Sequence, residues 1–146
     1  MKIAIACDHG AIELKNLLIA HLEKKGYEVV NFGTDTNASC DYPDFAEPAA
    51  KAVASGDCHR GILLCTTGIG MSIAANKIPG IRCALLCDIM SAKLTRLHND
   101  TNMMSLGAGV VGPQLACEIT DAWLETPFSE DERHKRRIAK VMALEK

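Results

Sequence analysis

The stretch that decides the fold is RGILLCTTGIGMSIAANK, residues 60–77. Its opening run, RGILLC (60–65), is almost entirely apolar beyond Gly61, as expected of a strand that is buried on both faces of a sheet. A short loop with two glycines follows, and IGMSIAANK (69–77) has apolar residues at helical spacing. Strand, tight loop and helix in this order predict one unit of a parallel sheet.

The same alternation extends from this stretch toward both ends of the chain. Further strands are predicted over 2–7, 27–33, 79–87 and 102–111, and further helices over 11–26, 41–56, 89–99, 113–126 and 129–146. Right-handed crossovers leave few topologies for such a pattern. We therefore expect an α/β fold with one domain over 1–146: a doubly wound, Rossmann-like, five-stranded parallel sheet with helices on both faces and a charged C-terminal helix.

The amino-acid composition and net charge indicate which kinds of partner the protein has. The 146 residues are 48% hydrophobic, which is enough for a core, and the net charge of −2 gives no general electrostatic reason to bind nucleic acid or a membrane surface. No apolar run reaches the roughly 18 residues that a membrane span requires. We expect neither a nucleic-acid nor a membrane partner.

The seven cysteines are an odd number and form no CxxC pair. A secreted disulfide framework normally has an even, clustered set, so this pattern favours a reducing cytoplasm. Cys83 and Cys87 are close in sequence, but no His/Cys cluster follows them, and we predict no metal site.

Ligands of parallel α/β sheets bind at the carboxyl ends of the strands. The predicted strands end there in polar and reactive groups: Cys7-Asp8-His9-Gly10, Cys65-Thr66-Thr67-Gly68-Ile69-Gly70 and Cys87-Asp88. Gly68 and Gly70 would let backbone N–H groups approach a phosphate or a developing oxyanion, although a plain strand–helix turn is the alternative. The loop lacks the lysine of a P-loop and the GxGxxG spacing, so nucleotide binding is not indicated.

Several side chains near these ends have both a chemical and a structural interpretation. Cys65, at the start of a helix, would be a usable base or nucleophile, or simply the last buried residue of its strand. Asp8 and His9 are titratable groups with no packing reason to end a buried strand, although Asp8 could cap a helix. His98 and Asn99 could form a helix C-cap.

A basic run near the C-terminus, RHKRR (133–137), has the same ambiguity. Arg133 and Arg137 are spaced i, i+4, so both would project from one side of a helix and could hold one phosphate. The alternative is an ordinary solvated helix face.

Taken together, the segments ACDHGAIELK, DYPDFA, CTTGIGMSIAANKIPGIRCAL, RLHNDTNMMSLGAGVVG, DAWL and ERHKRRI resemble the ribose-5-phosphate isomerase B family over nearly the whole chain. The resemblance implies interconversion of aldose and ketose phosphates, ribose 5-phosphate to ribulose 5-phosphate, through an enediolate and without metal or cofactor. It also implies a homodimer or tetramer with active sites between subunits, and a place in carbohydrate metabolism and the pentose phosphate pathway.

The resemblance assigns a role to each matching residue. Cys65 would be the base, Thr67, Gly68 and Gly70 would line the anion hole, and Asp8 and His98 would assist ring opening. Tyr42 and Asn99 would contact the sugar, whereas His9, Arg133 and Arg137 would bind the phosphate.

Four positions depart from the family pattern. Thr66 stands where glycine is common and adds bulk beside the sugar end of the pocket. Gly109 replaces an arginine, and Asp131 and Glu132 replace glycines and add negative charge near the phosphate. Allose 6-phosphate, galactose 6-phosphate or a tetrose 4-phosphate therefore stay open as substrates, as does a non-catalytic sugar-phosphate binding protein.

Overall fold

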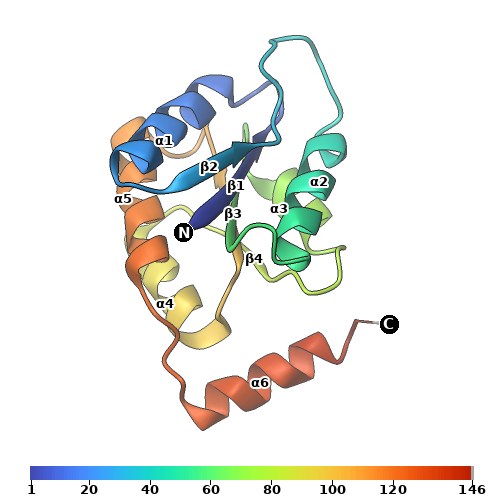
Figure 1. The fold of residues 1–146 in the computed structure, drawn as a ribbon, viewed down its shortest axis with the longest axis vertical. Coiled ribbons are helices and arrows are strands. Elements are labelled where there is room, and N and C mark those ends of the chain that lie inside the picture. Colours follow the sequence, from blue (N-terminus) through green and yellow to red (C-terminus); the bar gives the residue numbers. More distant parts are fainter. Residues whose placement is uncertain (146) are drawn as a thin grey trace.

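The computed structural model describes residues 1–145 and contains one five-stranded parallel sheet in the order β2-β1-β3-β5-β4. The strands are β1 (Lys2–Cys7), β2 (Glu28–Asn31), β3 (Arg60–Cys65), β4 (Cys83–Leu85) and β5 (Met103–Gly107). The helices are α1 (Ile12–Lys24), α2 (Pro43–Ala54), α3 (Ile69–Ala75), α4 (Ile89–Asn99), α5 (Pro113–Glu125) and α6 (Glu132–Met142). The predicted doubly wound sheet is confirmed (Figure 1).

Helices cover both faces of the sheet because its strands are apolar on both faces. On one face Ile62 and Leu64 of β3 belong to the cluster that holds α1, α4 and α5, with the fully buried Trp123. On the other face Leu63 and Cys65 belong to the cluster that holds α2 and α3. Successive residues of β3 thus face opposite layers, which separates the surroundings of Cys65 from those of its chain neighbours.

The fourth strand is much shorter than the predicted 79–87, and it does not end at Cys87-Asp88 as we expected. Pro79 has no N–H to donate, and Gly80 has φ +87°, so the chain turns before the ladder begins. The last ladder bond is donated by the N–H of Leu86 to the Ser105 carbonyl at 3.0 Å, and Asp88 is the N-cap of α4, where its side chain accepts the N–H of Ser91 at 2.7 Å.

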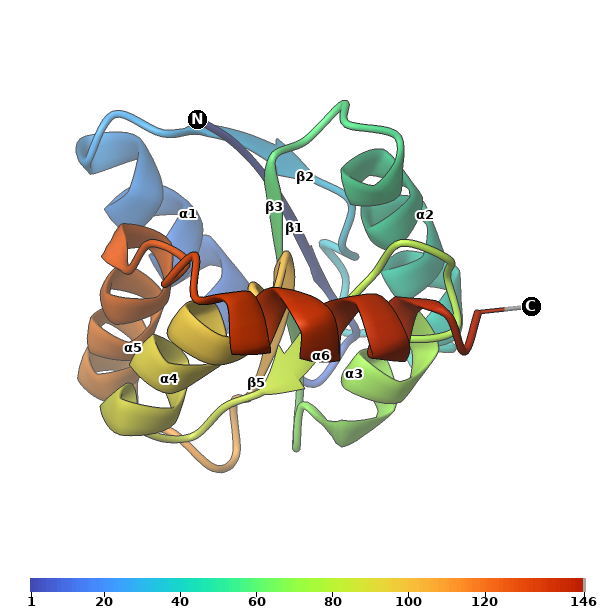
Figure 2. The same cartoon turned by 90° about the horizontal axis from the view of Figure 1, so that it is seen from below.

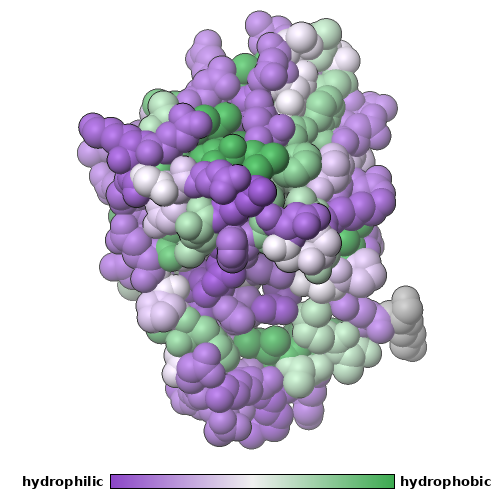
Figure 3. Space-filling model, in the orientation of Figure 1, coloured by the Kyte–Doolittle hydropathy of each residue, from purple (hydrophilic) through white to green (hydrophobic). Residues whose placement is uncertain are grey.

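The C-terminal helix also begins later than the predicted 129. Glu130 has φ +59°, which no helix allows, and the Asp131 side chain caps the helix by accepting the N–H of Arg133 at 2.9 Å. Helix α6 then crosses the edge of the sheet at which the strands begin and contacts the body through α4 (Figures 1 and 2). Figure 3 shows a hollow between the body and α6, with hydrophobic residues on the inner side of the helix.

Among residues 1–145, no helix is both long enough and apolar enough to cross a membrane.

Candidate active site

The edge at which β1, β3 and β5 end carries most of the predicted site. These strands are neighbours, and Cys7 is in register with Leu64 while Cys65 is in register with Gly107. The loops that follow the three strands are therefore adjacent. They meet where the strand order reverses, between β1 and β3, which is the position at which doubly wound sheets bind ligands.

Cys65 is buried at the base of the glycine loop. Its sulfur accepts a hydrogen bond from the backbone N–H of Gly68 at 3.0 Å. A general base must be able to accept a proton, and the sulfur is thus oriented as an acceptor. Gly68 has φ +76°, and a Cβ on it would lie 2.7 Å from Leu85 and 2.8 Å from the backbone of Leu106. Glycine is thus required here both for conformation and for space. Ser105 fixes the loop further by donating to the Gly68 carbonyl at 2.7 Å.

Thr67, Gly70 and Tyr42 complete the wall around this loop. The Thr67 hydroxyl is exposed and accepts the N–H of Ile69 at 3.3 Å. Tyr42, directly before α2, lies over Gly70 so closely that a Cβ there would be 2.8 Å from the tyrosine ring. The absence of a side chain at position 70 therefore lets the phenol approach the loop.

Asp8 and His9 enter from β1. Asp8 is buried, its N–H donates to the Leu64 carbonyl at 3.2 Å, and its carboxylate accepts the N–H of Gly10 at 2.9 Å. By strand alternation it faces the α2 and α3 layer, as Cys65 does. His9 is exposed, and its Nδ1 accepts the N–H of Cys40 at 3.3 Å.

The loop that carries Cys40 and leads to Tyr42 has an anchor that sequence reasoning missed. The Lys15 side chain is fully buried, and its ammonium donates to the Thr34 carbonyl at 2.8 Å and pairs with the Asp35 carboxylate. This contact holds the pKa of Asp35 below its usual value. A lysine on the apolar side of a helical pattern was the available signal, because such a group is buried only when it is paired.

The remaining four predicted residues lie at the opposite edge of the sheet. Helix α4 runs back toward the start of β5, so His98 and Asn99 stand where the strands begin. Arg133 and Arg137 are exposed on α6, which contacts α4. The His98 ring contacts that of His134, with 4.5 Å between centroids. Within one chain, the structure does not bring these four residues to Cys65.

Asp131, one of the departures noted above, has a local partner. In addition to capping α6, its carboxylate lies 3.2 Å from Nε of Arg133. The backbone N–H of Arg133 foremost, and then the nearby cationic side chains, hold the pKa of Asp131 below its usual value. The added negative charge therefore lies next to Arg133.

His134 was not predicted as part of this group. It is buried against His98, and its Nδ1 lies 2.7 Å from the Ser129 hydroxyl. Burial foremost, with the neighbouring His98 and Arg133, holds the pKa of His134 below its usual value. A neutral imidazole thus supports the ring of His98.

The rest of the HNDTN segment builds the end of α4. Asp100 is left-handed, with φ +44°, and its carboxylate accepts from the buried Arg96 at 2.8 Å. Arg82 donates to the carbonyls of Asn99 and Asp100 at 3.0 and 2.6 Å. Trp123 donates to Thr101 at 3.0 Å. These contacts fix the positions of His98 and Asn99, which explains why the whole segment is distinctive.

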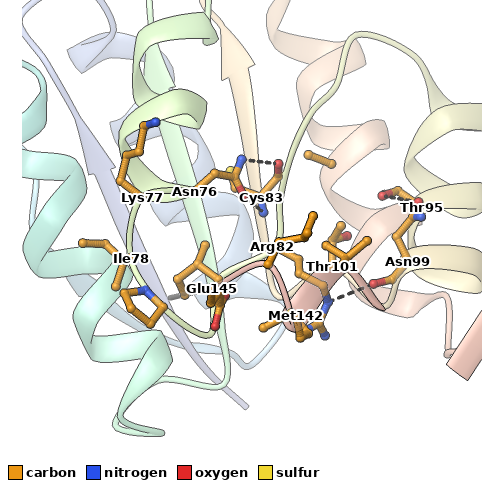
Figure 4. Close-up of a pocket in the computed structure, with 15 residues that line it drawn as sticks. Asn76, Lys77, Ile78, Arg82, Cys83, Thr95, Asn99, Thr101, Met142 and Glu145 are labelled. Carbon is orange, nitrogen blue, oxygen red and sulfur yellow. Dashed lines mark hydrogen bonds between the residues drawn. The ribbon is translucent and has the colours of Figure 1, made fainter. Parts of the chain in front are cut away.

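A cavity of about 620 Å³ lies beside Asn99 (Figure 4). Arg82, Cys83 and Asn76 line one side, and Met142 and Glu145 line the side formed by the C-terminal segment. A second cavity, of about 480 Å³, lies at the other edge of the sheet and is lined by His9, Thr66 and Gly109.

Comparison with known proteins agrees with the resemblance inferred from the sequence. The model of the family described as Ribose/Galactose Isomerase matches residues 3–141. Ribose-5-phosphate isomerase B of Escherichia coli is 46% identical over 99% of this chain and 96% of that protein. D-erythrulose-4-phosphate isomerase of Pectobacterium atrosepticum is also 46% identical, over 88% of this chain and 85% of that protein.

The solved structures agree as well. Ribose-5-phosphate isomerase B of Clostridium thermocellum superposes with a TM-score of 0.97 at 50% identity, and covers 99% of this chain and 97% of that one. With a family model that spans nearly all of the sequence and full-length relatives at this level of identity, the chain belongs to the ribose/galactose isomerase family and is an aldose–ketose isomerase.

Proposed function

We propose that the chain, as one catalytic domain over 1–146, interconverts ribose 5-phosphate and ribulose 5-phosphate without metal or cofactor. The observation that carries the proposal is the sulfur of Cys65, which is set against the N–H of Gly68 at the carboxyl edge of the sheet. Relatives named ribose-5-phosphate isomerase B support the choice of sugar.

Isomerisation requires a base beside the reacting carbons and donors for the charge that develops. The Cys65 thiolate takes the proton from C2 of the open-chain aldose, and the electron pair moves onto the carbonyl oxygen to give an enediolate. The loop of Thr67, Gly68 and Gly70 surrounds that oxygen, and the first N–H groups of α3 have no intrahelical acceptor. A proton then passes from the C2 hydroxyl to the C1 oxygen, and Cys65 returns the carbon-bound proton to C1 as the C2 carbonyl forms, which gives the ketose and regenerates the base.

Ring opening and phosphate binding require groups from both edges of the sheet. Asp8 adjoins Cys65, and we assign it to ring opening together with His98, while Tyr42 and Asn99 contact the sugar. His9 binds the phosphate together with Arg133 and Arg137. Because His98, Asn99 and both arginines lie at the far edge of their own chain, we assign them to the active site of a partner subunit.

An exposed apolar surface supports a homodimer. It consists of Ile69 and Ile73 on α3, Leu85 on β4, and Met90 and Leu94 on α4. Ile69 directly follows the Gly68 loop, whereas Met90 and Leu94 lie in the same i, i+4 row as His98. A two-fold pairing of this surface would therefore place His98 of each subunit near Cys65 of the other.

All seven cysteines are free thiols, which supports a reducing compartment, and we propose the cytoplasm. The relative that is named for D-erythrulose 4-phosphate supports a second candidate substrate, a tetrose 4-phosphate.

The test is an isomerisation assay of the wild type and Cys65→Ala against ribose 5-phosphate, allose 6-phosphate, galactose 6-phosphate and erythrose 4-phosphate. We expect turnover of ribose 5-phosphate by the wild type and a loss of about 10²–10⁴-fold in Cys65→Ala, the usual contribution of a positioned base. Cys117→Ala is the matched control, because Cys117 is a half-buried thiol on α5, away from the loop.

Three outcomes contradict parts of the proposal. If Cys65→Ala keeps its activity, Cys65 is structural. If only another sugar turns over, the substrate assignment is wrong while the chemistry stands. If no sugar turns over yet sugar phosphates bind, the chain is a binding protein.

A further inference from the structure

The cavity of about 480 Å³ lies on the side of β3 opposite to Cys65. His9 and the first turn of α1 form one wall, and Thr66 and Gly109 form another. Because His9 is our proposed phosphate ligand, we assign the phosphate end of the substrate to this cavity. The inference below therefore rests on the proposed function.

The Thr66 side chain is exposed and lies in a slot between two glycines. A Cβ on Gly10 would lie 2.4 Å from the Thr66 hydroxyl oxygen, and a Cβ on Gly109 would lie 3.2 Å from its methyl carbon. The slot is held in place because Gly109 donates its N–H to the Thr66 carbonyl at 2.8 Å. A β-branched side chain between fixed backbones has little freedom to move aside.

Thr66 also stands between the two ends of the substrate. Its neighbour Cys65 faces the α2 and α3 layer, whereas Thr66 faces the cavity that His9 lines. A sugar phosphate that is held at its reacting carbons by the Cys65 loop and at its phosphate near His9 must pass the end of β3. With both ends of the substrate anchored, each additional carbon makes the middle of the sugar bend outward, toward the end of β3.

We propose that Thr66 is a specificity-determining residue that limits the length of the substrate. Its methyl and hydroxyl groups fill the space into which a six-carbon sugar phosphate would bow, so four- and five-carbon substrates fit and six-carbon substrates are rejected. Because Gly10 and Gly109 have no side chains, there is room for the Thr66 side chain. Thr66 then fills the space that a side chain at position 109 would otherwise fill.

The test compares kcat/KM for allose 6-phosphate and ribose 5-phosphate in the wild type, Thr66→Ala, Thr66→Ser and Thr66→Val. We expect the six- to five-carbon ratio to rise about tenfold in Thr66→Ala, the lower range for one carbon's worth of pocket space. Thr66→Val keeps the shape without the hydroxyl and should retain the wild-type ratio. Thr66→Ser lacks only the methyl and should fall between.

An unchanged ratio in an active Thr66→Ala overturns the inference, and so does a Thr66→Val that behaves like Thr66→Ala. Preference of the wild type for allose 6-phosphate overturns it as well. If the wild type turns over none of the sugars, the proposed function is wrong, and the proposal that Thr66 limits substrate length is wrong as well.

A second measurement tests the slot independently of activity. Gly10→Ala should lower the melting temperature, because its Cβ meets the Thr66 hydroxyl. In Gly10→Ala/Thr66→Ala the nearest remaining side-chain atom is Asp8 Oδ1 at 3.2 Å, so most of the loss should be recovered. Equal losses with and without Thr66 would show that Thr66 does not fill the slot.

Discussion

The two edges of the sheet differ in how they hold their functional groups. At the carboxyl edge, Cys65 and Asp8 are buried, and backbone groups of Gly68 and Gly10 contact them directly. At the amino edge, His98 and Arg133 are exposed, and what is buried is their support, namely His134 and Arg96. The functional side chains of the carboxyl edge are thus enclosed within their own subunit. Those of the amino edge project into solvent from buried supporting residues.

This difference indicates two complementary half-sites. A group that acts on a substrate inside its own subunit can be buried there. A group that acts on a substrate held by a neighbouring subunit must project from the surface. Its position then depends on the buried residues that support it.

The largest expected effect is recovery of activity from two inactive variants. Cys65→Ala and His98→Ala should each be nearly inactive alone. After the two are mixed, unfolded and refolded together, about a quarter of the wild-type activity should return, because half of the dimers are mixed and each has one intact site of two. If no activity returns although mass spectrometry detects mixed dimers, the half-sites do not combine across subunits.

At the carboxyl edge, Gly68→Ala should destabilise the protein by about 2–5 kcal/mol. The left-handed backbone contributes about 1–2 kcal/mol and the contacts with Leu85 and Leu106 the rest. Gly26→Ala is the matched control, since Gly26 has φ +88° with open space around it. Urea unfolding measures both variants, and equal losses would mean that the close packing of the loop contributes nothing.

At the amino edge, Arg96→Met should cost about 2–3 kcal/mol, because Asp100 and the Thr101 carbonyl lose a charged donor. It should also lower kcat through His98, which follows on the same helix. Arg136→Met, an exposed arginine on α6, is the control and should change stability by less than about 0.5 kcal/mol. Normal kcat in a folded Arg96→Met would show that the Arg96 contacts do not position His98.

The smallest effect concerns pH. The pKa of the buried His134 is below its usual value of 6.5, so the folded protein binds fewer protons here than the unfolded chain. The free energy of unfolding should therefore be highest above pH 6.5 and should fall as the pH drops through the folded pKa. Urea unfolding at several pH values measures this slope. His134→Gln should flatten it, and an unchanged slope in His134→Gln would show that this histidine does not cause the dependence.

Most of the fold could be predicted because strands buried on both faces have unmistakable apolar runs. The bounds of several elements were wrong, and the strand predicted over 79–87 shows the limit of that signal. Its sequence is apolar along most of its length, but Pro79 and Gly80 turn the chain at one end and the Asp88 cap withdraws it at the other. Local backbone chemistry decided the ends of β4 where hydrophobicity alone could not.

The candidate site divides in the same way. Residues that follow strands, such as Asp8 and Cys65, could be placed together because strand ends meet at one edge. Tyr42 and His98 came only from the family resemblance, since their position depends on a loop path and on a second subunit. Lys15 and Arg96 were missed because a single charged residue in a helix looks solvent-exposed until the carboxylate and the backbone carbonyl that it binds are known.

Strand β4 connects the two half-sites of each chain. Arg82, directly before it, binds the end of α4, and Leu85, at its other end, lies against Gly68. The separation between these anchors is about 10 Å at roughly 3.3 Å per residue. In the proposed dimer this short strand acts as a spacer that sets how far apart the two catalytic centres lie. A single-residue insertion within it would therefore misalign both centres at once.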